Sequence, residues 1–199
     1  MARDFTIPPG VILAGGRGRR MGGQDKAFLP LAGRALVDHA IARLDPQVSL
    51  LAISANGDPR RFGPKRPVLA DSFDDFPGPL AGILAALDWA QALGSDWVVT
   101  TATDTPFLPA TLVDRLVRAQ VASAAPIVLA ESPAGLQPVT GLWYAGLAEG
   151  LRATLIAGSF KVTDFTDAKD AVSVPFAEEA FFNVNTPEDL ARAEAMLAG

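Results

Sequence analysis

The sequence predicts an α/β protein: a single-domain, three-layer sandwich whose mainly parallel sheet carries helices on both faces. The first observation is that short apolar, β-branched runs alternate along the chain with segments whose apolar residues recur at helical spacing. Strands joined by helical crossovers pair in parallel, and such sheets are covered on both sides. The second observation is size, because 199 residues with 49% hydrophobic composition suit one domain, residues 1–199, with a sizeable core.

The expected elements follow the chain in a regular order. A strand begins at Val11 and leads into a glycine-rich loop, and the apolar residues over 34–44 indicate an amphipathic helix. Gly94 is typical of a residue that ends a helix, and Thr186 followed by Pro187 is typical of a helix start. The other predicted strands lie over 48–54, 67–71 and 97–103, and the other predicted helices over 80–93, 109–120 and 145–157. Two weaker strands, over 127–130 and 139–144, lie on either side of a turn-rich stretch over 132–138. A last helix runs to about Leu197.

The loop after the first strand has the composition of a triphosphate-binding cradle. Residues 15–26 hold five glycines and four basic side chains, and Lys26 stands at the end. Glycines can take positive φ and let backbone N–H groups approach phosphate oxygens, while basic side chains add charge-assisted hydrogen bonds. The alternative is an ordinary glycine-rich turn with solvated arginines.

Two familiar phosphate-binding loops do not fit this spacing. Met21 stands where the dinucleotide fingerprint needs its third glycine, and Arg20 and Asp25 stand where a P-loop ending at Lys26 needs glycine. A hydride-transfer enzyme and a Walker-type ATPase are therefore not expected.

Three polar residues follow predicted strands, at the edge where ligands of parallel sheets bind. Asp104 comes at the end of the strand over 97–103, and Asp71 and Asn56 follow two others. Magnesium needs only one or two carboxylates beside water and substrate phosphates, so Asp104 alone is a sufficient ligand. Asn56 and Asp71 are suited to hydrogen bonds with a nucleobase or ribose. For each of the three, the alternative is an ordinary turn or capping residue.

Composition excludes several classes of function. The chain has no cysteine and a single histidine, His39, so disulfide scaffolds, thiolate metal sites and multi-histidine zinc sites are ruled out. No apolar run reaches the length of a membrane span, and residues 1–10 lack the apolar stretch of a secretory signal, so we expect a cytoplasmic protein without membrane contact. His39 is expected to be a partly buried helix residue.

Charge is distributed unevenly along the chain. The net charge is −5, yet residues 1–66 carry eleven Lys or Arg against five Asp or Glu, and residues 67–199 carry six against seventeen. The positive part contains the glycine-rich loop. An acidic protein with a local basic patch suits a small phosphorylated ligand better than nucleic acid, whose phosphates require a broad basic face.

Short motifs occur in order over nearly the whole chain. They are Leu13-Ala14-Gly15-Gly16, Arg20-Met21-Gly22-Gly23 with Asp25-Lys26, Asn56, Asp71, Pro77-Gly78-Pro79-Leu80-Ala81-Gly82, Asp104-Thr105-Pro106 and Asn183-Val184-Asn185-Thr186-Pro187-Glu188. Together they resemble the signature of the molybdenum cofactor guanylyltransferases, within the nucleotidyltransferase superfamily. The double glycine of the first motif and the later Pro-Leu-Ala-Gly favour the guanylyl branch over the cytidylyl branch.

The resemblance implies a nucleotide-diphospho-sugar-transferase-like variant of the Rossmann fold, and it implies the reaction. GMP would pass from GTP to the phosphate of molybdenum-loaded molybdopterin, with release of pyrophosphate and with Mg²⁺ held by Asp104. Lys26, Arg20 and Asp104 would be catalytic. The implied GTP contacts are Leu13, Ala14, Gly15, Gly16, Lys26, Asn56, Asp71 and Asp104, in the N-terminal part. The implied acceptor contacts are Gln137, Asn183 and Asn185, in the C-terminal part.

Other functions stay open at this point. They are a cytidylyltransferase acting on molybdopterin, a sugar-phosphate nucleotidyltransferase, and a nucleotide-binding module without catalysis. This sequence also departs from the family pattern in having Thr103 where cysteine is frequent, and Lys161 alone where adjacent arginines are frequent. We expect GTP and molybdopterin as small-molecule partners, molybdoenzymes or their chaperones as protein partners, and a monomer or weak oligomer.

Overall fold

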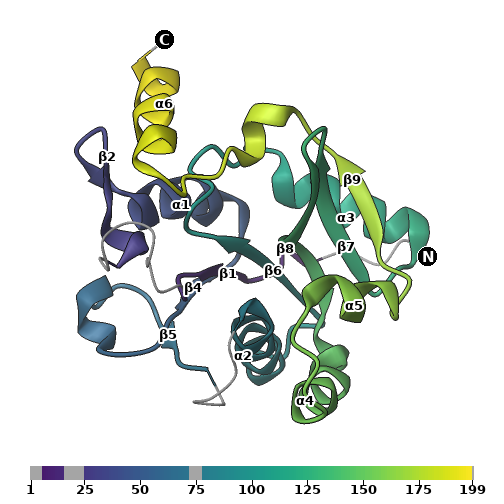
Figure 1. Ribbon diagram of the computed structural model, residues 1–199. Coiled ribbons are helices and arrows are strands. Elements are labelled where there is room, and N and C mark those ends of the chain that lie inside the picture. The colour runs from purple at the N-terminus through teal and green to yellow at the C-terminus, as the bar shows by residue number, and fades with distance from the viewer. Residues whose placement is uncertain (1–5, 16–24, 72–77, 199) are drawn as a thin grey trace.

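The computed structural model describes residues 6–15, 25–71 and 78–198. Its centre is a seven-stranded sheet in the order β5-β4-β1-β6-β8-β7-β9, with helices on both faces (Figure 1). This arrangement confirms the predicted three-layer α/β architecture. A separate two-stranded antiparallel sheet pairs β2 (Pro30–Leu31) with β3 (Arg34–Ala35).

One half of the large sheet is entirely parallel. It consists of β1 (Gly10–Leu13), β4 (Leu51–Ser54), β5 (Val68–Leu69) and β6 (Trp97–Ala102). Each of the three pairings between these strands is parallel, as predicted for strands that are joined by helical crossovers. Their carboxyl ends therefore lie at one edge of the sheet.

The other half contains a long antiparallel strand, of which only the part over 139–144 was predicted. β8 (Gly135–Tyr144) lies antiparallel to both β6 and β7 (Ile127–Ser132), and β9 (Val172–Pro175) lies parallel to β7. The predicted turn-rich stretch over 132–138 is too long, because Ser132 already pairs with Gly135 and the hairpin connection is only two residues long. Pro138 is tolerated inside a strand because the β7–β8 register shifts there, so that it has no partner in β7.

Two apolar layers enclose the sheet. On one face, α2 (Pro79–Ala92), α4 (Ala148–Ile156) and α5 (Val162–Asp167) contribute to one apolar cluster together with Val11 and Leu13 of β1. On the other face, α1 (Leu36–Leu44) and α3 (Leu112–Ser123) contribute to a second cluster together with Ile12, the residue between Val11 and Leu13 (Figure 1). Successive side chains of a strand point to opposite faces, so β1 contributes to both layers.

The last helix, α6 (Pro187–Ala198), lies beside the small sheet. Its Ala193 packs with Leu31, Leu36 and Val184 in a cluster of its own. The predicted helix start is confirmed, because the Thr186 hydroxyl accepts a hydrogen bond from the backbone N–H of Asp189.

Two glycines, one just after the end of α2 and one inside it, have clear structural reasons. Gly94 takes a φ of +71°, and the N–H groups of Gly94 and Ser95 bond back to Gln91 and Ala90 in a Schellman motif. Gly82 lies inside the helix, where a Cβ would stand 2.8 Å from the Ser54 hydroxyl oxygen and 3.2 Å from Leu13 Cδ2. Glycine therefore lets α2 approach the sheet closely.

Trp143 is a core residue. Its side chain is completely buried on β8, and its indole N–H donates to the Thr100 hydroxyl at 2.8 Å. His39 is a half-buried helix residue, as expected, with Nε2 at 2.9 Å from the Leu31 carbonyl oxygen.

In the part of the chain that the structure describes, no helix is long and apolar enough to cross a membrane.

Candidate functional site

The register of the parallel strands brings four predicted site residues to one edge of the sheet. Leu13 pairs with both Ser54 and Ala102, and Ser54 pairs with Leu69. The residues two positions after these four are Gly15, Asn56, Asp104 and Asp71, so they lie at the same level along neighbouring strands. Their order along the edge is therefore Asp71, Asn56, Gly15, Asp104, which follows the strand order.

Lys26 joins this edge to the C-terminal part of the chain. It begins the short helical turn η2 (Lys26–Phe28), and its Nζ lies 2.6 Å from Asp104 Oδ2. The same ammonium donates to Asn185 Oδ1 at 2.5 Å. A backbone hydrogen bond joins the same two parts of the chain, since the Val184 N–H donates to the Asp104 carbonyl oxygen at 2.9 Å. Residues separated by up to 159 positions in the sequence thus meet at one ammonium group.

Asp104 has the free oxygen that a cation site requires. Oδ2 accepts from Lys26, whereas Oδ1 is buried and has no hydrogen-bond partner among the described residues. An unpaired buried carboxylate oxygen is costly, so such a group calls for a ligand. The described residues contain no cluster of three or more His, Cys, Asp or Glu that could hold a metal. A hard cation with one protein carboxylate, water and substrate phosphates therefore fits this arrangement best.

Asn56 and Asp71 form a reciprocal pair at the other end of the edge. The Asn56 amide donates to Asp71 Oδ2 at 2.8 Å, and the Asp71 backbone N–H donates to Asn56 Oδ1 at 3.0 Å. Burial raises the pKa of the Asp71 carboxyl, and the hydrogen bond from Asn56 opposes that rise. Within the described residues Asp71 Oδ1 accepts no hydrogen bond, so it can serve as an acceptor at a partly desolvated position.

The backbone between these two clusters is open at Gly15. Leu13 and Ala14 are buried, but a Cβ added at Gly15 would meet no atom of the described residues within 4 Å. Gly15 does not take a positive φ, so what glycine provides here is open space beside the backbone. That space adjoins Asn56 and Asp104 on the neighbouring strands. Gly16 and Arg20, two of the predicted site residues, lie outside the described residues.

The predicted acceptor residues have three different environments. Asn185 touches Lys26, and the Asp189 carboxylate holds its turn by accepting from the backbone N–H groups of Asn185 and Thr186, both at 2.9 Å. These bonds, chiefly the one from Asn185, lower the pKa of Asp189. Asn183 is exposed and makes no hydrogen bond within the described part of the chain. The Gln137 amide donates inside its own hairpin, to Ser132 Oγ at 3.4 Å and to the Gly135 carbonyl at 3.3 Å.

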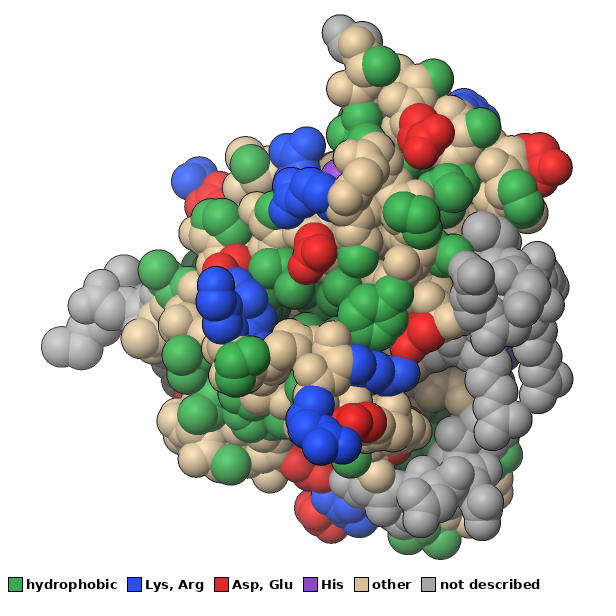
Figure 2. Space-filling model, turned by 90° about the vertical axis from the view of Figure 1, so that its left-hand side faces the viewer, with side chains coloured by type: hydrophobic (Ala, Val, Ile, Leu, Met, Phe, Trp, Pro, Cys, Tyr) green, Lys and Arg blue, Asp and Glu red, His purple; other side chains and the backbone are tan. Residues whose placement is uncertain are grey.

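Many basic side chains of the N-terminal part are neutralised locally. Besides Lys26 with Asp104, Arg60 pairs with Asp58, Arg61 with Asp25 and Arg66 with Asp45. Figure 2 shows the consequence on one side of the molecule, where Lys and Arg side chains lie among Asp and Glu. The described basic side chains of residues 1–66 therefore do not form a broad basic face on this side.

Comparison with known proteins adds an independent line of evidence. Residues 10–172 match the model of the MobA-like NTP transferase domain. A molybdenum cofactor guanylyltransferase from Cereibacter sphaeroides is 51% identical over 190 residues, covering 94% of this chain and 96% of that protein. One from Mesorhizobium japonicum is 44% identical over 206 residues, covering 99% and 98%. This chain belongs to the MobA-like NTP transferase family.

Solved structures show that the fold is that of this family. The molybdopterin-guanine dinucleotide biosynthesis protein A of Archaeoglobus fulgidus superposes with a TM-score of 0.78 at 22% identity, covering 96% of this chain and 98% of that one. A 4-diphosphocytidyl-2C-methyl-D-erythritol synthase of Anaerococcus prevotii gives 0.74 at 14% identity, with 98% of each chain covered. The resemblance and the fold predicted from the motifs are thus confirmed.

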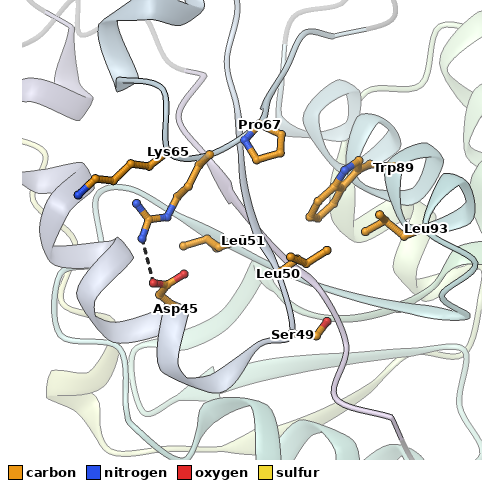
Figure 3. Close-up of a pocket in the computed structure, with 9 residues that line it drawn as sticks. Asp45, Ser49, Leu50, Leu51, Lys65, Pro67, Trp89 and Leu93 are labelled. Atoms are coloured by element: carbon orange, nitrogen blue, oxygen red, sulfur yellow. Dashed lines mark hydrogen bonds and ion pairs between the residues drawn. The ribbon is translucent and has the colours of Figure 1, made fainter.

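A prominent groove of the MobA-like domain lies elsewhere and contains none of the predicted site residues. Figure 3 shows this groove of about 470 Å³, whose walls include Trp89 and Leu93 from the end of α2 and Leu50 at the start of β4. The Asp45–Arg66 ion pair, at 2.9 Å, borders it. Because it lies at the amino end of β4, it is at the opposite edge of the sheet from Asn56 and Asp104.

Proposed function

We propose that this protein transfers GMP from GTP to the phosphate of molybdenum-loaded molybdopterin, yielding a molybdopterin guanine dinucleotide and pyrophosphate. The observation that carries the proposal is the meeting of Lys26, Asp104 and Asn185 at the end of a parallel sheet edge that also holds Asn56 and Asp71. The relatives that cover most of the chain at 44–51% identity are named for this activity.

The nucleotide lies along the edge, with its nucleoside at Asn56 and Asp71. Both residues offer oxygen acceptors, and the desolvated Asp71 carboxyl forms stronger hydrogen bonds there than it would in water. The open backbone at Gly15 lets the phosphates approach. The expected role of Arg20 is to add charge at the phosphates, and it stays a prediction.

Lys26 and Asp104 act at the reacting end. The phosphate oxygen of the acceptor attacks the α-phosphorus of GTP, the bond from that phosphorus to its bridging oxygen breaks, and pyrophosphate leaves with the electron pair. Lys26 moves from Asp104 to the phosphate oxygens, where its charge offsets the negative charge that grows during transfer. Asp104 would hold Mg²⁺ through its unpaired Oδ1, and the bound metal would supply further charge neutralisation. A phosphate monoester is largely dianionic near neutral pH, so the acceptor needs no general base.

Asn185 faces the acceptor side of the same centre. Its amide touches Lys26 from a segment that is separate from the nucleotide-binding strands, so it can contact the incoming phosphate and Lys26 together. Gln137 and Asn183 are further acceptor contacts in this proposal. Positioning of two substrates and charge neutralisation are sufficient for this reaction, and no covalent intermediate is required.

The test is a transfer assay with the purified protein, GTP, Mg²⁺ and molybdenum-loaded molybdopterin. The dinucleotide and pyrophosphate should appear in equal amounts, and omission of Mg²⁺ should abolish both. Turnover with CTP in place of GTP would assign the chain to the cytidylyl branch. Turnover with a sugar phosphate as acceptor would contradict the pterin assignment, and tight GTP binding without any product would indicate a binding module.

A further inference from the structure

Arg61 joins two parts of the site that are distant in sequence. It lies on the helical turn η4 (Pro59–Phe62), between β4 and β5. One guanidinium nitrogen, Nη1, donates to Asp25 Oδ2 at 2.5 Å, and the other, Nη2, donates to the backbone carbonyl of Asn56 at 2.7 Å. No sequence pattern marks Arg61 for this role, since it is one basic residue among several in its segment.

The guanidinium is held in place by its surroundings. Its central carbon lies 4.8 Å from the Phe62 ring centroid and 5.9 Å from that of Phe28, and the two rings are themselves 5.1 Å apart. Only 33% of the Arg61 side chain and 27% of the Asp25 side chain are exposed. A planar guanidinium that stacks on aromatic rings and bonds in two directions is far more rigid than a surface ion pair.

Each end of this bridge supports a different part of the nucleotide site. Asp25 also accepts a hydrogen bond from the backbone N–H of Ala27, which caps the turn that begins at Lys26. Asn56 positions Asp71 through two hydrogen bonds. Arg61 therefore connects the segment that carries Lys26 with the turn that carries Asn56.

We propose that Arg61 is a positioning residue that fixes the distance between the phosphate end and the nucleoside end of the nucleotide site. The inference rests on the proposed function, because it takes these two ends to bind one nucleotide. Loss of the bridge leaves each cluster intact but lets η2 and the Asn56 turn move independently. A nucleotide that contacts both must then order them on binding, which weakens its affinity.

The neighbouring arginine is a matched control. Arg60 lies on the same turn, and within the described residues its guanidinium bonds only to Asp58, two residues away; 89% of its side chain is exposed. Both arginines carry one positive charge near the same edge. Arg60→Ala thus removes the same charge and the same kind of side chain, but no contact between the two clusters.

The experiment is GTP titration by calorimetry, with Mg²⁺, of the wild type, Arg61→Ala, Arg61→Lys and Arg60→Ala. We expect Arg61→Ala to weaken GTP binding about tenfold, equivalent to about 1.4 kcal/mol. Arg61→Lys should restore little of the lost GTP affinity, because a lysine ammonium lacks the planar guanidinium that donates hydrogen bonds in two directions. Arg60→Ala should stay within about twofold of the wild type. Equal affinities for Arg61→Ala and Arg60→Ala would overturn the proposal.

A double-mutant cycle tests whether Arg61 acts through Asp25. If it does, Asp25→Ala and Arg61→Ala together should weaken binding by less than the product of their separate effects. Independent, multiplying effects would contradict a bridge. Should the wild type prefer CTP, the same comparison is made with CTP, so the positioning role is judged apart from the base that is bound. A wild type that binds neither nucleotide would overturn both proposals.

Discussion

The two halves of the sheet deliver their polar residues in different ways. In the half formed by β5, β4, β1 and β6, all strands run in the same direction, so residues that follow the strands meet at one edge. In the other half, β8 runs the opposite way, and Gln137 stands near its beginning. Asn185 reaches the site from a turn before α6 that belongs to no strand of either half. The position of a polar residue relative to a strand thus predicts its place at the site only in the parallel half of the sheet.

Substitution of Asp104 should give the largest effect and tests the parallel half directly. Asp104→Ala removes the carboxylate that Lys26 contacts and the unpaired Oδ1 that suits a cation. We expect the rate of GMP transfer to fall about 10³-fold, because several kcal/mol of charge stabilisation is lost. Single-turnover pyrophosphate release measures it, with circular dichroism as the control for folding. A rate within tenfold of the wild type would remove Asp104 from the reacting centre.

A pair of asparagines tests the C-terminal side. Asn185→Ala removes the contact with Lys26, whereas Asn183→Ala alters an exposed side chain two residues earlier in the same turn. We expect about a tenfold loss of kcat/KM for the acceptor with the first, from about 1.4 kcal/mol, and a smaller loss of about two- to threefold with the second, whose proposed acceptor contact does not involve Lys26. Equal losses would mean that the turn binds the acceptor as a whole, and that Lys26 contact is not decisive.

Two helical glycines extend the comparison to the packing of helices against the two halves of the sheet. Gly82 on α2 faces buried Ser54 and Leu13, while a Cβ at Gly150 on α4 would meet open space. Gly82→Ala should lower the free energy of unfolding by about 1 kcal/mol, since overpacking outweighs the gain in helix propensity. Gly150→Ala should raise it by about 0.5–1 kcal/mol. Urea unfolding of both variants measures this. A stabilised Gly82→Ala protein would show that α2 and β1 can separate freely.

The two perturbed carboxyls at the site predict a pH effect on GTP binding. Burial raises the pKa of Asp71, so it takes up a proton at a higher pH than an ordinary aspartate, whereas hydrogen bonds lower the pKa of Asp189 and keep it charged over the same range. GTP affinity should therefore fall severalfold between about pH 7 and about pH 4. Affinities of Asp71→Asn over this range should change less than those of the wild type. The same slope in both proteins would assign the titration to another group.

The parallel half was predictable because local signals and topology agree there. Short apolar strands, helical crossovers and polar residues at strand ends place Asp71, Asn56 and Asp104 together without further information. The first half of β8 was missed because Pro138 and small residues indicate a turn, while cross-strand pairing and a register shift decide otherwise. The Lys26–Asn185 contact and the Arg61 bridge depend on how loops fold over the edge, which no residue pattern encodes.

The most direct test is a crystal structure with a non-hydrolysable GTP analogue and Mn²⁺. The account predicts that the anomalous signal of the metal lies about 2.0–2.6 Å from Asp104 Oδ1, the range of hard divalent cations. It also predicts the base beside Asn56 and Asp71, with the phosphates at Gly15 and Lys26. A nucleotide bound in the groove beside Trp89 and Leu93, at the opposite edge of the sheet, would contradict it.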